Sequence, residues 1–224
     1  MIVFLSPSKT FTPEKTAGIS EPIFKHKNRE LFLKLMALDS MVLKERLSIS
    51  DKLWTQVLTY YQEPTNLAMA VKRYGGIVYK QLEAVSFLKE HTLYILDAFY
   101  GLVRSTDAIM KYRLDFSFDR KLHEFWQKDV HDYLLTHHKD ELCIDLSSQE
   151  FAFLIPKDLN CYKIEFALSD RKIPNTTLKI MRGKMANYLL SHSLKRLDEL
   201  KTLVLDGFTY SSELSSEKLL VFVK

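Results

Sequence analysis

The chain has 224 residues, a net charge of +4, 46 % hydrophobic and 27 % charged side chains. This length suits one large domain or two small ones, and enough apolar residues are present to fill a core, which excludes a chain that is disordered throughout. The mild positive charge permits a polyanionic partner without requiring one, because only clustered basic residues raise the local potential.

The lack of a recognisable targeting signal and the two cysteines expected to be free both point to the cytoplasm. The first residues lack the basic segment and long apolar core of a signal peptide, and no apolar run approaches the ~18 residues of a membrane helix. We therefore expect a cytoplasmic protein without membrane contact. Cys143 and Cys161 lie in apolar runs, which predicts two buried free thiols rather than a disulfide framework.

Apolar runs and helical spacing predict alternating strands and helices. The clearest helix spans 51–61, where apolar residues recur at helical spacing after Ser50, a residue type that caps helix starts. In chain order we expect a strand over 1–5; helices over 29–38, 51–61 and 66–74, the last ended by Gly75 and Gly76; a strand over 92–96; a helix over 122–139; strands over 142–146 and 162–168; a helix over 181–197; and a strand over 218–223.

The alternation predicts the fold class. No repeat, low-complexity segment or shift in composition divides the chain. We predict a single mixed α/β domain over residues 1–224, with a central sheet surrounded by helices. Residues 206–217 are expected to form an irregular connection of a length that often carries function.

The most pointed local feature follows the first strand. Ser6, Lys9 and Thr10 belong to the run Ser-Pro-Ser-Lys-Thr, which begins where the predicted strand ends. Ligands of α/β proteins often bind at such strand ends, and hydroxyls, amides and an ammonium together can hold a phosphate or carboxylate. The run lacks the glycines of a Walker A loop. A solvated turn is the alternative interpretation.

Two further segments combine cations with other binding features. Tyr100 and Arg104, then Tyr112 and Arg113, place arginine forks for phosphate beside aromatic rings that can stack on bases. The alternative is that these arginines pack over neighbouring tyrosines.

A third basic segment is Arg182-Gly183-Lys184, near the expected start of a helix. Exposed amides there would attract an anion, and the glycine would permit the close approach of another backbone.

The sequence carries none of the common metal or cofactor signatures. His123-Glu124 is not followed by a second histidine at the spacing of a zinc protease, and no Cys-x-x-Cys occurs. Nor is there a Gly-x-Ser-x-Gly elbow or a glycine-rich dinucleotide fingerprint. We expect no metal and no cofactor.

Taken in order, these segments resemble a known family. The similar segments are residues 2–10 (Ile-Val-Phe-Leu-Ser-Pro-Ser-Lys-Thr), 48–53, 74–79 (Tyr-Gly-Gly-Ile-Val-Tyr), 96–104, 107–114, Phe125-Trp126, 144–151 (Ile-Asp-Leu-Ser-Ser-Gln-Glu-Phe), 182–186 (Arg-Gly-Lys-Met-Ala), 207–210 and 220–223. The chain is identified on this ordered set as resembling the YaaA-like peroxide stress proteins.

Some positions depart from the family pattern. Ile77 stands where the family has aspartate, and Gln81 where a glycine is usual. Asp97-Ala98 replaces Ser-Gly, and Ser105-Thr106 replaces Pro-Leu. Any role that the family gives to the missing aspartate or to those glycines is therefore not carried over to this chain.

The resemblance implies a mixed α/β fold with a basic cleft and a helix-hairpin-helix-like element, for which 47–61 is the candidate segment. It also implies cytosolic residence, DNA binding, and a role in surviving hydrogen peroxide by limiting iron-driven damage. The first hypothesis is a protein that binds double-stranded or distorted DNA without sequence preference. Phosphates would contact Lys9, Arg104, Arg113, Arg182 and Lys184, while Tyr100 and Tyr112 would stack on exposed bases.

Two other hypotheses remain open. One is an enzyme acting on a small anionic or nucleotide-like substrate, in which Lys9 holds the anion or attacks as an amine, helped by Ser6 and Thr10. The other is an iron-handling protein, for which no compact ligand spacing is visible. A long open basic groove would favour DNA binding, whereas a closed pocket around Lys9 with convergent hydroxyls would favour the small-molecule hypothesis.

Overall fold

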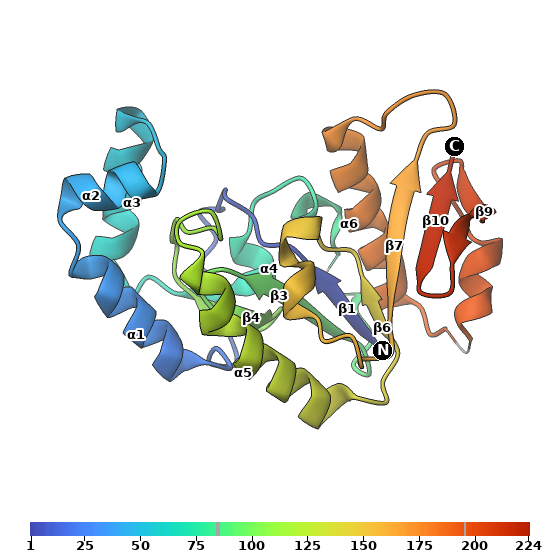
Figure 1. The fold of residues 1–224 in the computed structure, drawn as a ribbon, viewed down its shortest axis with the longest axis horizontal. Coiled ribbons are helices and arrows are strands. Elements are labelled where there is room, and N and C mark those ends of the chain that lie inside the picture. Colours follow the sequence, from blue (N-terminus) through green and yellow to red (C-terminus); the bar gives the residue numbers. More distant parts are fainter. Residues whose placement is uncertain (84–85, 195) are drawn as a thin grey trace.

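The computed structural model describes residues 1–83, 86–194 and 196–224. An eight-stranded sheet runs through the molecule in the order β4-β3-β1-β6-β7-β10-β9-β8 (Figure 1). Its strands are β1 (Ile2–Leu5), β3 (Thr92–Asp97), β4 (Gly101–Arg104), β6 (Cys143–Asp145), β7 (Cys161–Ala167), β8 (Val204–Leu205), β9 (Phe208–Ser216) and β10 (Leu219–Val223). The five central strands, β3, β1, β6, β7 and β10, are parallel to one another. At one side β4 pairs antiparallel with β3, and at the other β9 pairs antiparallel with β10 and β8 with β9.

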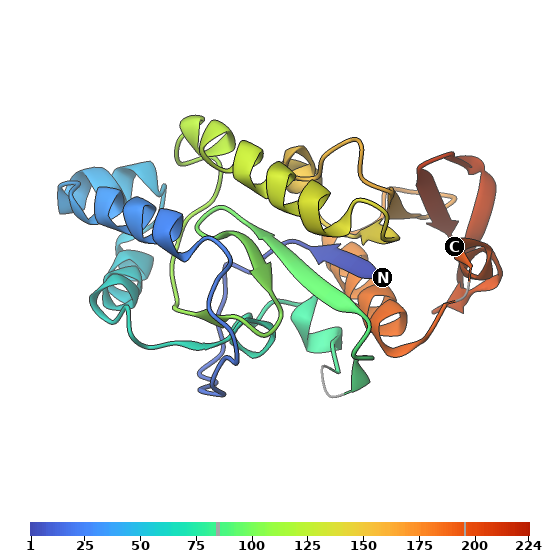
Figure 2. The ribbon, with the colours of Figure 1, turned by 90° about the horizontal axis from the view of Figure 1, so that it is seen from below.

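Helices cover both faces of the sheet. They are α1 (Lys25–Met36), α2 (Ser40–Arg46), α3 (Asp51–Gln62), α4 (Ala70–Arg73), α5 (Lys121–His138) and α6 (Asn175–Ser191), with 3-10 turns η1 (Tyr79–Gln81), η3 (Gln149–Leu154) and η4 (Leu197–Thr202). Figure 2 shows α5 and α6 on opposite faces of the sheet, and Figure 1 shows α1, α2 and α3 gathered beyond its β4 side. A separate two-stranded sheet joins β2 (Ala68–Met69) to β5 (Ala108–Ile109).

The first strand belongs to both cores. Side chains alternate along a strand, so neighbours point to opposite faces. Ile2 and Phe4 pack in the core that includes the buried face of α5, whereas Val3 and Leu5 pack in the core that includes the buried face of α6. All four side chains are buried. A continuous apolar run is what a parallel strand covered on both faces requires.

The structure confirms the mixed α/β class and most predicted elements. Ser50 caps α3, its side chain accepting a hydrogen bond from the Leu53 amide. The segment proposed for the hairpin contains the end of the α2–α3 connection and α3 itself, and its assignment as a helix-hairpin-helix stays a prediction. No helix in the described part of the chain combines the length and hydropathy that crossing a bilayer requires.

Three predicted elements were wrong. The helix expected over 181–197 begins earlier, at Asn175, because polar residues extend it before its apolar face becomes visible in the sequence. The connection expected over 206–217 is mostly strand β9, which pairs with β10. The helix expected over 66–74 is reduced to Ala70–Arg73, because Ala68 and Met69 pair with β5 instead.

Candidate binding site

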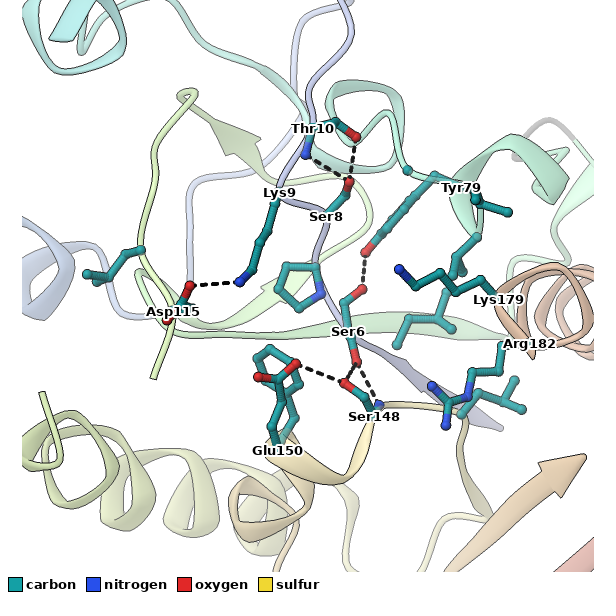
Figure 3. Close-up of a pocket in the computed structure, with 18 of the residues that line it drawn as sticks. Ser6, Ser8, Lys9, Thr10, Tyr79, Asp115, Ser148, Glu150, Lys179 and Arg182 are labelled. Carbon is teal, nitrogen blue, oxygen red and sulfur yellow. Dashed lines mark hydrogen bonds and ion pairs between the residues drawn. The ribbon is translucent and has the colours of Figure 1, made fainter. Parts of the chain in front are cut away.

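The fold creates a crevice at the ends of β1 and β6. β1 and β6 are parallel neighbours in the sheet. The chain continues from β1 to β3, which pairs with β1 on the side away from β6, and from β6 to β7, which pairs with β6 on the side away from β1. Their outgoing connections therefore diverge, and ligands of α/β sheets bind in the gap so formed. A cavity of about 420 Å³ occupies this position (Figure 3).

Four loops and one helix form the walls. Leu5, Ser6, Pro7, Ser8, Lys9 and Thr10 come from the first strand end; Gly76, Ile77, Val78 and Tyr79 from the turn before η1; Tyr112, Arg113, Leu114 and Asp115 from the segment before α5; Leu146, Ser148, Glu150 and Phe151 from the β6 end; and Lys179 and Arg182 from α6. The loops approach closely at Gly76, where an added Cβ would lie 2.6 Å from the Ser8 hydroxyl. A larger residue there would push the first loop into the cavity.

A network of hydroxyls ties the floor of the cavity together. Ser6 Oγ lies 2.9 Å from Ser148 Oγ and accepts a hydrogen bond of 2.7 Å from the Ser148 amide. Ser148 Oγ also donates to Glu150 Oε1 at 3.3 Å. The Tyr79 hydroxyl donates to the Ser6 carbonyl at 2.7 Å. Ser6 is thus fixed from two sides, and Glu150 lies at the far end of the chain of hydroxyls (Figure 3).

Lys9 reaches across the cavity mouth to Asp115, with 2.8 Å between Nζ and Oδ2. The lysine side chain is 57 % exposed and the aspartate 19 %. Burial alone would raise the pKa of Asp115, but hydrogen bonds from Lys9 and Ser117 outweigh it and hold that pKa below its ordinary value. Lys9 is therefore an engaged side chain of the cavity mouth rather than a freely solvated turn residue.

Other cations of the cavity have no such partner. Lys179, Arg182 and Arg113 form no ion pair within the described residues, and the Nε atoms of both arginines are buried without a hydrogen-bond acceptor there. Burial lowers the pKa of Arg182, and the more distant charges of Asp145 and Glu165 oppose that effect. Buried donors of this kind are normally satisfied, so their position in a cavity wall points to an anionic ligand.

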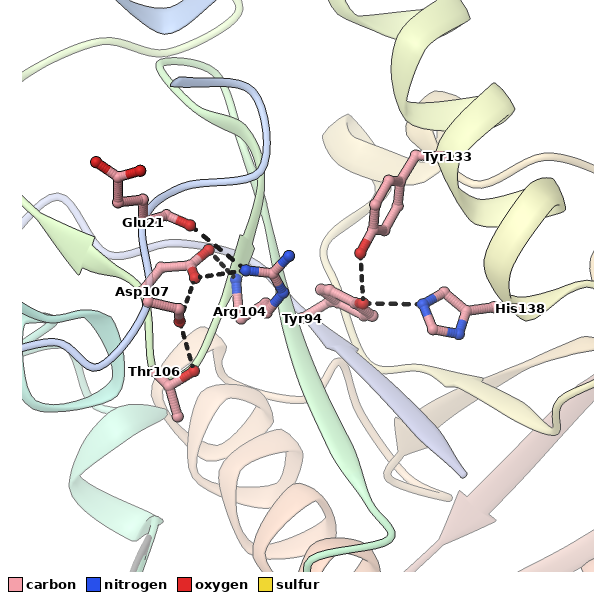
Figure 4. Close-up of polar contacts among 8 residues, drawn as sticks. Glu21, Tyr94, Arg104, Thr106, Asp107, Tyr133 and His138 are labelled. Carbon is pink, nitrogen blue, oxygen red and sulfur yellow. Dashed lines mark hydrogen bonds and ion pairs between the residues drawn. The ribbon is translucent and has the colours of Figure 1, made fainter. Parts of the chain in front are cut away.

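The structure brings together six of the nine predicted site residues. Ser6, Lys9, Thr10, Tyr112, Arg113 and Arg182 all line the cavity. Tyr100, Arg104 and Lys184 do not. Arg104 lies at the β4 edge, where its guanidinium binds Asp107 at 3.1 Å and lies near Tyr94 and Tyr133 (Figure 4).

Two expected roles need correction. Tyr100 and Tyr112 are only 3 % and 4 % exposed, and Tyr112 stacks on Phe99 in the core, so neither ring offers a face to a base. Lys184 pairs with Asp206 and lies in the middle of α6 beside Arg182, where backbone amides are used within the helix and cannot hold an anion. An anion bound at α6 would therefore contact its side chains rather than its backbone amides.

Sequence reasoning missed Lys179, Asp115, Ser148 and Glu150. Lys179 precedes Arg182 by three residues, which places both on one helix face, but the helix was predicted to start after it. Ser148 and Glu150 follow β6 as Ser6 follows β1, so the same reasoning about strand ends would have found them. In the described part of the chain, no group of three His, Cys, Asp or Glu side chains could hold a metal ion.

Comparison with known proteins identifies the family. The family model described as "Peroxide stress protein YaaA" matches residues 1–214. A UPF0246 protein of Finegoldia magna is 33 % identical, with 100 % of this chain and 98 % of the relative aligned. UPF0246 proteins of Fusobacterium nucleatum and Ligilactobacillus salivarius are each 29 % identical, with 100 % of this chain and 99 % and 100 % of the relatives aligned. The chain belongs to the YaaA family of peroxide stress proteins.

Proposed function

We propose that this peroxide stress protein acts by binding a small phosphate-bearing ligand in the cavity at the ends of β1 and β6. The observation that carries the proposal is the convergence of Arg113, Lys179 and Arg182 on one cavity without ion-pair partners among the described residues. Guanidinium forks match phosphate oxygens, and a lysine adds a mobile point charge.

The size and lining of the cavity support a small ligand. About 420 Å³ lies within the range of sites for small molecules, roughly 300–1,000 Å³. Such sites combine apolar walls with a few polar groups, as Leu5, Leu114 and Leu146 do here beside the hydroxyls of Ser6 and Ser148. Because the ammonium of Lys9 is already engaged with Asp115, we assign Lys9 to holding an anion rather than to attacking as an amine.

Calorimetric titration with inorganic pyrophosphate tests the proposal. Lys179→Ala and Arg182→Gln should each weaken binding about 10-fold or more, as expected for the loss of one charge-assisted contact. Lys184→Ala is the matched control, because Lys184 lies on the same helix, pairs with Asp206 and does not line the cavity. Absence of pyrophosphate binding, or equal losses in all three variants, would overturn the proposal.

DNA binding is a second candidate, favoured by a neighbouring hollow. That hollow is lined by Lys15, Lys72 and Lys80 and shares Tyr79 with the cavity. Its three lysines and the cations of the cavity outnumber the carboxylates of Glu14, Asp115 and Glu150 along both. A nucleic-acid backbone crossing both hollows would meet this excess of positive charge.

Fluorescence anisotropy with labelled duplex and bubble DNA at several salt concentrations tests the second candidate. Affinity should fall steeply with salt, because each neutralised phosphate releases about 0.9 counterion. A Lys72→Ala, Lys80→Ala double variant should lower DNA affinity and the salt slope while leaving pyrophosphate binding unchanged. Absence of DNA binding at low salt would remove this candidate.

Protection against iron-driven damage is proposed from the resemblance alone. A deletion strain should be more sensitive to hydrogen peroxide, and an iron chelator should restore its survival. Complementation connects this phenotype to the cavity: the Arg182→Gln protein should fail to restore survival of the deletion strain, whereas the Lys184→Ala control should restore it. Wild-type survival of the deletion strain with and without chelator would exclude the protective role in this organism.

A further inference from the structure

We propose that the ligand of the cavity is a ribonucleotide, with its phosphate on Lys179 and Arg182 and its ribose hydroxyls donating to Glu150. This inference rests on the proposed function and specifies the class of ligand. It is carried by the distribution of charge in the cavity, by the position of one carboxylate and by the apolar side chains that line the same cavity.

The cations without ion-pair partners among the described residues come from two parts of the cavity: Arg113 from the segment before α5, and Lys179 and Arg182 from α6. Lys179 and Arg182 project from α6 on one side, and Glu150 lies across the cavity beyond Ser6 and Ser148 (Figure 3). Lys9 lies at the mouth and is paired with Asp115, so the unpaired cations of α6 attract a phosphate more strongly than Lys9 does. A phosphate is therefore attracted to the α6 side and repelled from Glu150. A ligand that contacts both the α6 cations and Glu150 carries an anionic group at one end and hydrogen-bond donors further along.

Glu150 suits sugar hydroxyls as donors. Its carboxylate forms no ion pair within the part of the chain that the structure describes, and its one hydrogen bond there comes from Ser148 at 3.3 Å. An ionised carboxylate only accepts hydrogen bonds and has several lone pairs to offer, so a vicinal diol can donate to it twice. In α/β sheets that bind nucleotides, an acidic residue commonly accepts a ribose hydroxyl near the phosphate site.

An apolar wall supplies the place for a base. Pro7, Ile77 and Leu114 line the cavity together with the hydroxyl groups. Ile77 carries no charge, so this part of the lining is apolar. A planar base buries its face well against aliphatic side chains, and the hydrophobic contribution is about 25 cal/mol per Å² of apolar area removed from water. A sugar phosphate without a base would leave this wall uncovered.

The test is a panel of ligands titrated calorimetrically against the full chain. The panel contains adenosine monophosphate, its 2′-deoxy counterpart, ribose 5-phosphate, adenosine and pyrophosphate. The ribonucleotide should bind about 10-fold more tightly than the deoxynucleotide, since a hydrogen bond to a charged group is lost with the 2′-hydroxyl. Ribose 5-phosphate and adenosine should each bind more weakly than the whole nucleotide.

Variants assign the contacts. Glu150→Gln and Glu150→Ala should remove the preference for ribose, whereas pyrophosphate affinity should be kept or rise, because a carboxylate that repels anions is removed from the cavity. Glu213→Gln, which changes an exposed carboxylate on β9, is the matched control. Equal affinity for ribo- and deoxyribonucleotide, or for nucleotide and ribose 5-phosphate, would overturn this inference. If pyrophosphate still bound, the proposed function would stand. Failure of pyrophosphate as well as nucleotides would overturn both.

Discussion

Gly183 is the position where packing of the fold and shape of the cavity depend on each other. It lies in the middle of α6, and an added Cβ would lie 2.4 Å from the Val78 carbonyl oxygen and 2.8 Å from Gln81 Cβ. The glycine thus permits the close approach of another backbone that the sequence suggested. Val78 belongs to the turn that lines the cavity, so α6 and this turn cannot separate without changing the site.

The expected effect of Gly183→Ala follows from two opposed contributions. Alanine favours a helix interior over glycine by roughly 0.5–1 kcal/mol. Overpacking against a backbone oxygen that cannot rotate away costs roughly 1–3 kcal/mol. We expect a net loss of about 1–2 kcal/mol, which lowers the melting temperature by about 2–8 °C for a chain of this size.

Thermal melting followed by circular dichroism measures the first effect, and pyrophosphate titration measures the second. Binding should weaken in Gly183→Ala, because the added methyl group displaces the turn at Val78, which lines the cavity. Lys184→Ala, at the next position of the helix, should change stability by no more than about 1 kcal/mol and leave binding intact. If Gly183→Ala melted at or above the wild-type temperature, the close contact would not constrain the fold and this reasoning would be refuted.

Two further predictions concern the ion pair at the cavity mouth and the buried thiols. Lys9→Ala should cost at most about 1 kcal/mol at pH 7, because the pair is exposed, and should weaken pyrophosphate binding; unchanged melting and binding would make Lys9 a solvated turn residue. Since the folded pKa of Asp115 is lowered, this stabilisation is present above about pH 4 and lost as the pH falls through that pKa. Melting of wild type and variant should therefore converge once the pH is below that pKa, and a persistent gap would contradict the assignment. Burial raises the pKa of Cys143 to about 12 and that of Cys161 further, so both thiols should resist iodoacetamide and hydrogen peroxide in the native protein and react in denaturant. Mass spectrometry measures the modification. Reaction of either thiol in the native protein at the rate of an exposed thiol would contradict the prediction, as would a mass loss of two hydrogens from a Cys143–Cys161 disulfide.

The sequence was informative about the fold where burial alone determines the pattern. The apolar run at 1–5 and the spacing of α5 predicted the central strand and its covering helix, because both elements bury continuous apolar surface. The β9 strand was missed because its serines and Glu213 are polar and largely exposed, and only its pairing with β10 makes it a strand. Pairing partners are distant in sequence, so local periodicity cannot reveal them.

The site was predictable in part for the same reason. Ser6 and Lys9 follow a strand end, and the structure places both in the lining of a ligand-sized cavity. The partners of Lys9 and Ser6 are Asp115 and Ser148, which lie 106 and 142 residues further along the chain. The tyrosines failed as predictions because aromatic residues beside arginines occur equally in cores, and burial decides between core packing and stacking on a base.

Asp97 and Ile77 help to explain how this chain maintains its cavity. Asp97 is buried and accepts hydrogen bonds from the amides of Phe99 and Tyr100 and from the hydroxyls of Tyr74 and Tyr112. Burial raises the pKa of Asp97, although these donors oppose the shift. A serine at this position would accept fewer of these bonds, so the carboxylate fixes Tyr112 more firmly than a serine would. Because Arg113 follows Tyr112 directly, the buried aspartate anchors one of the three free cations of the cavity, while isoleucine at position 77 adds no carboxylate that would compete with an anionic ligand for those cations.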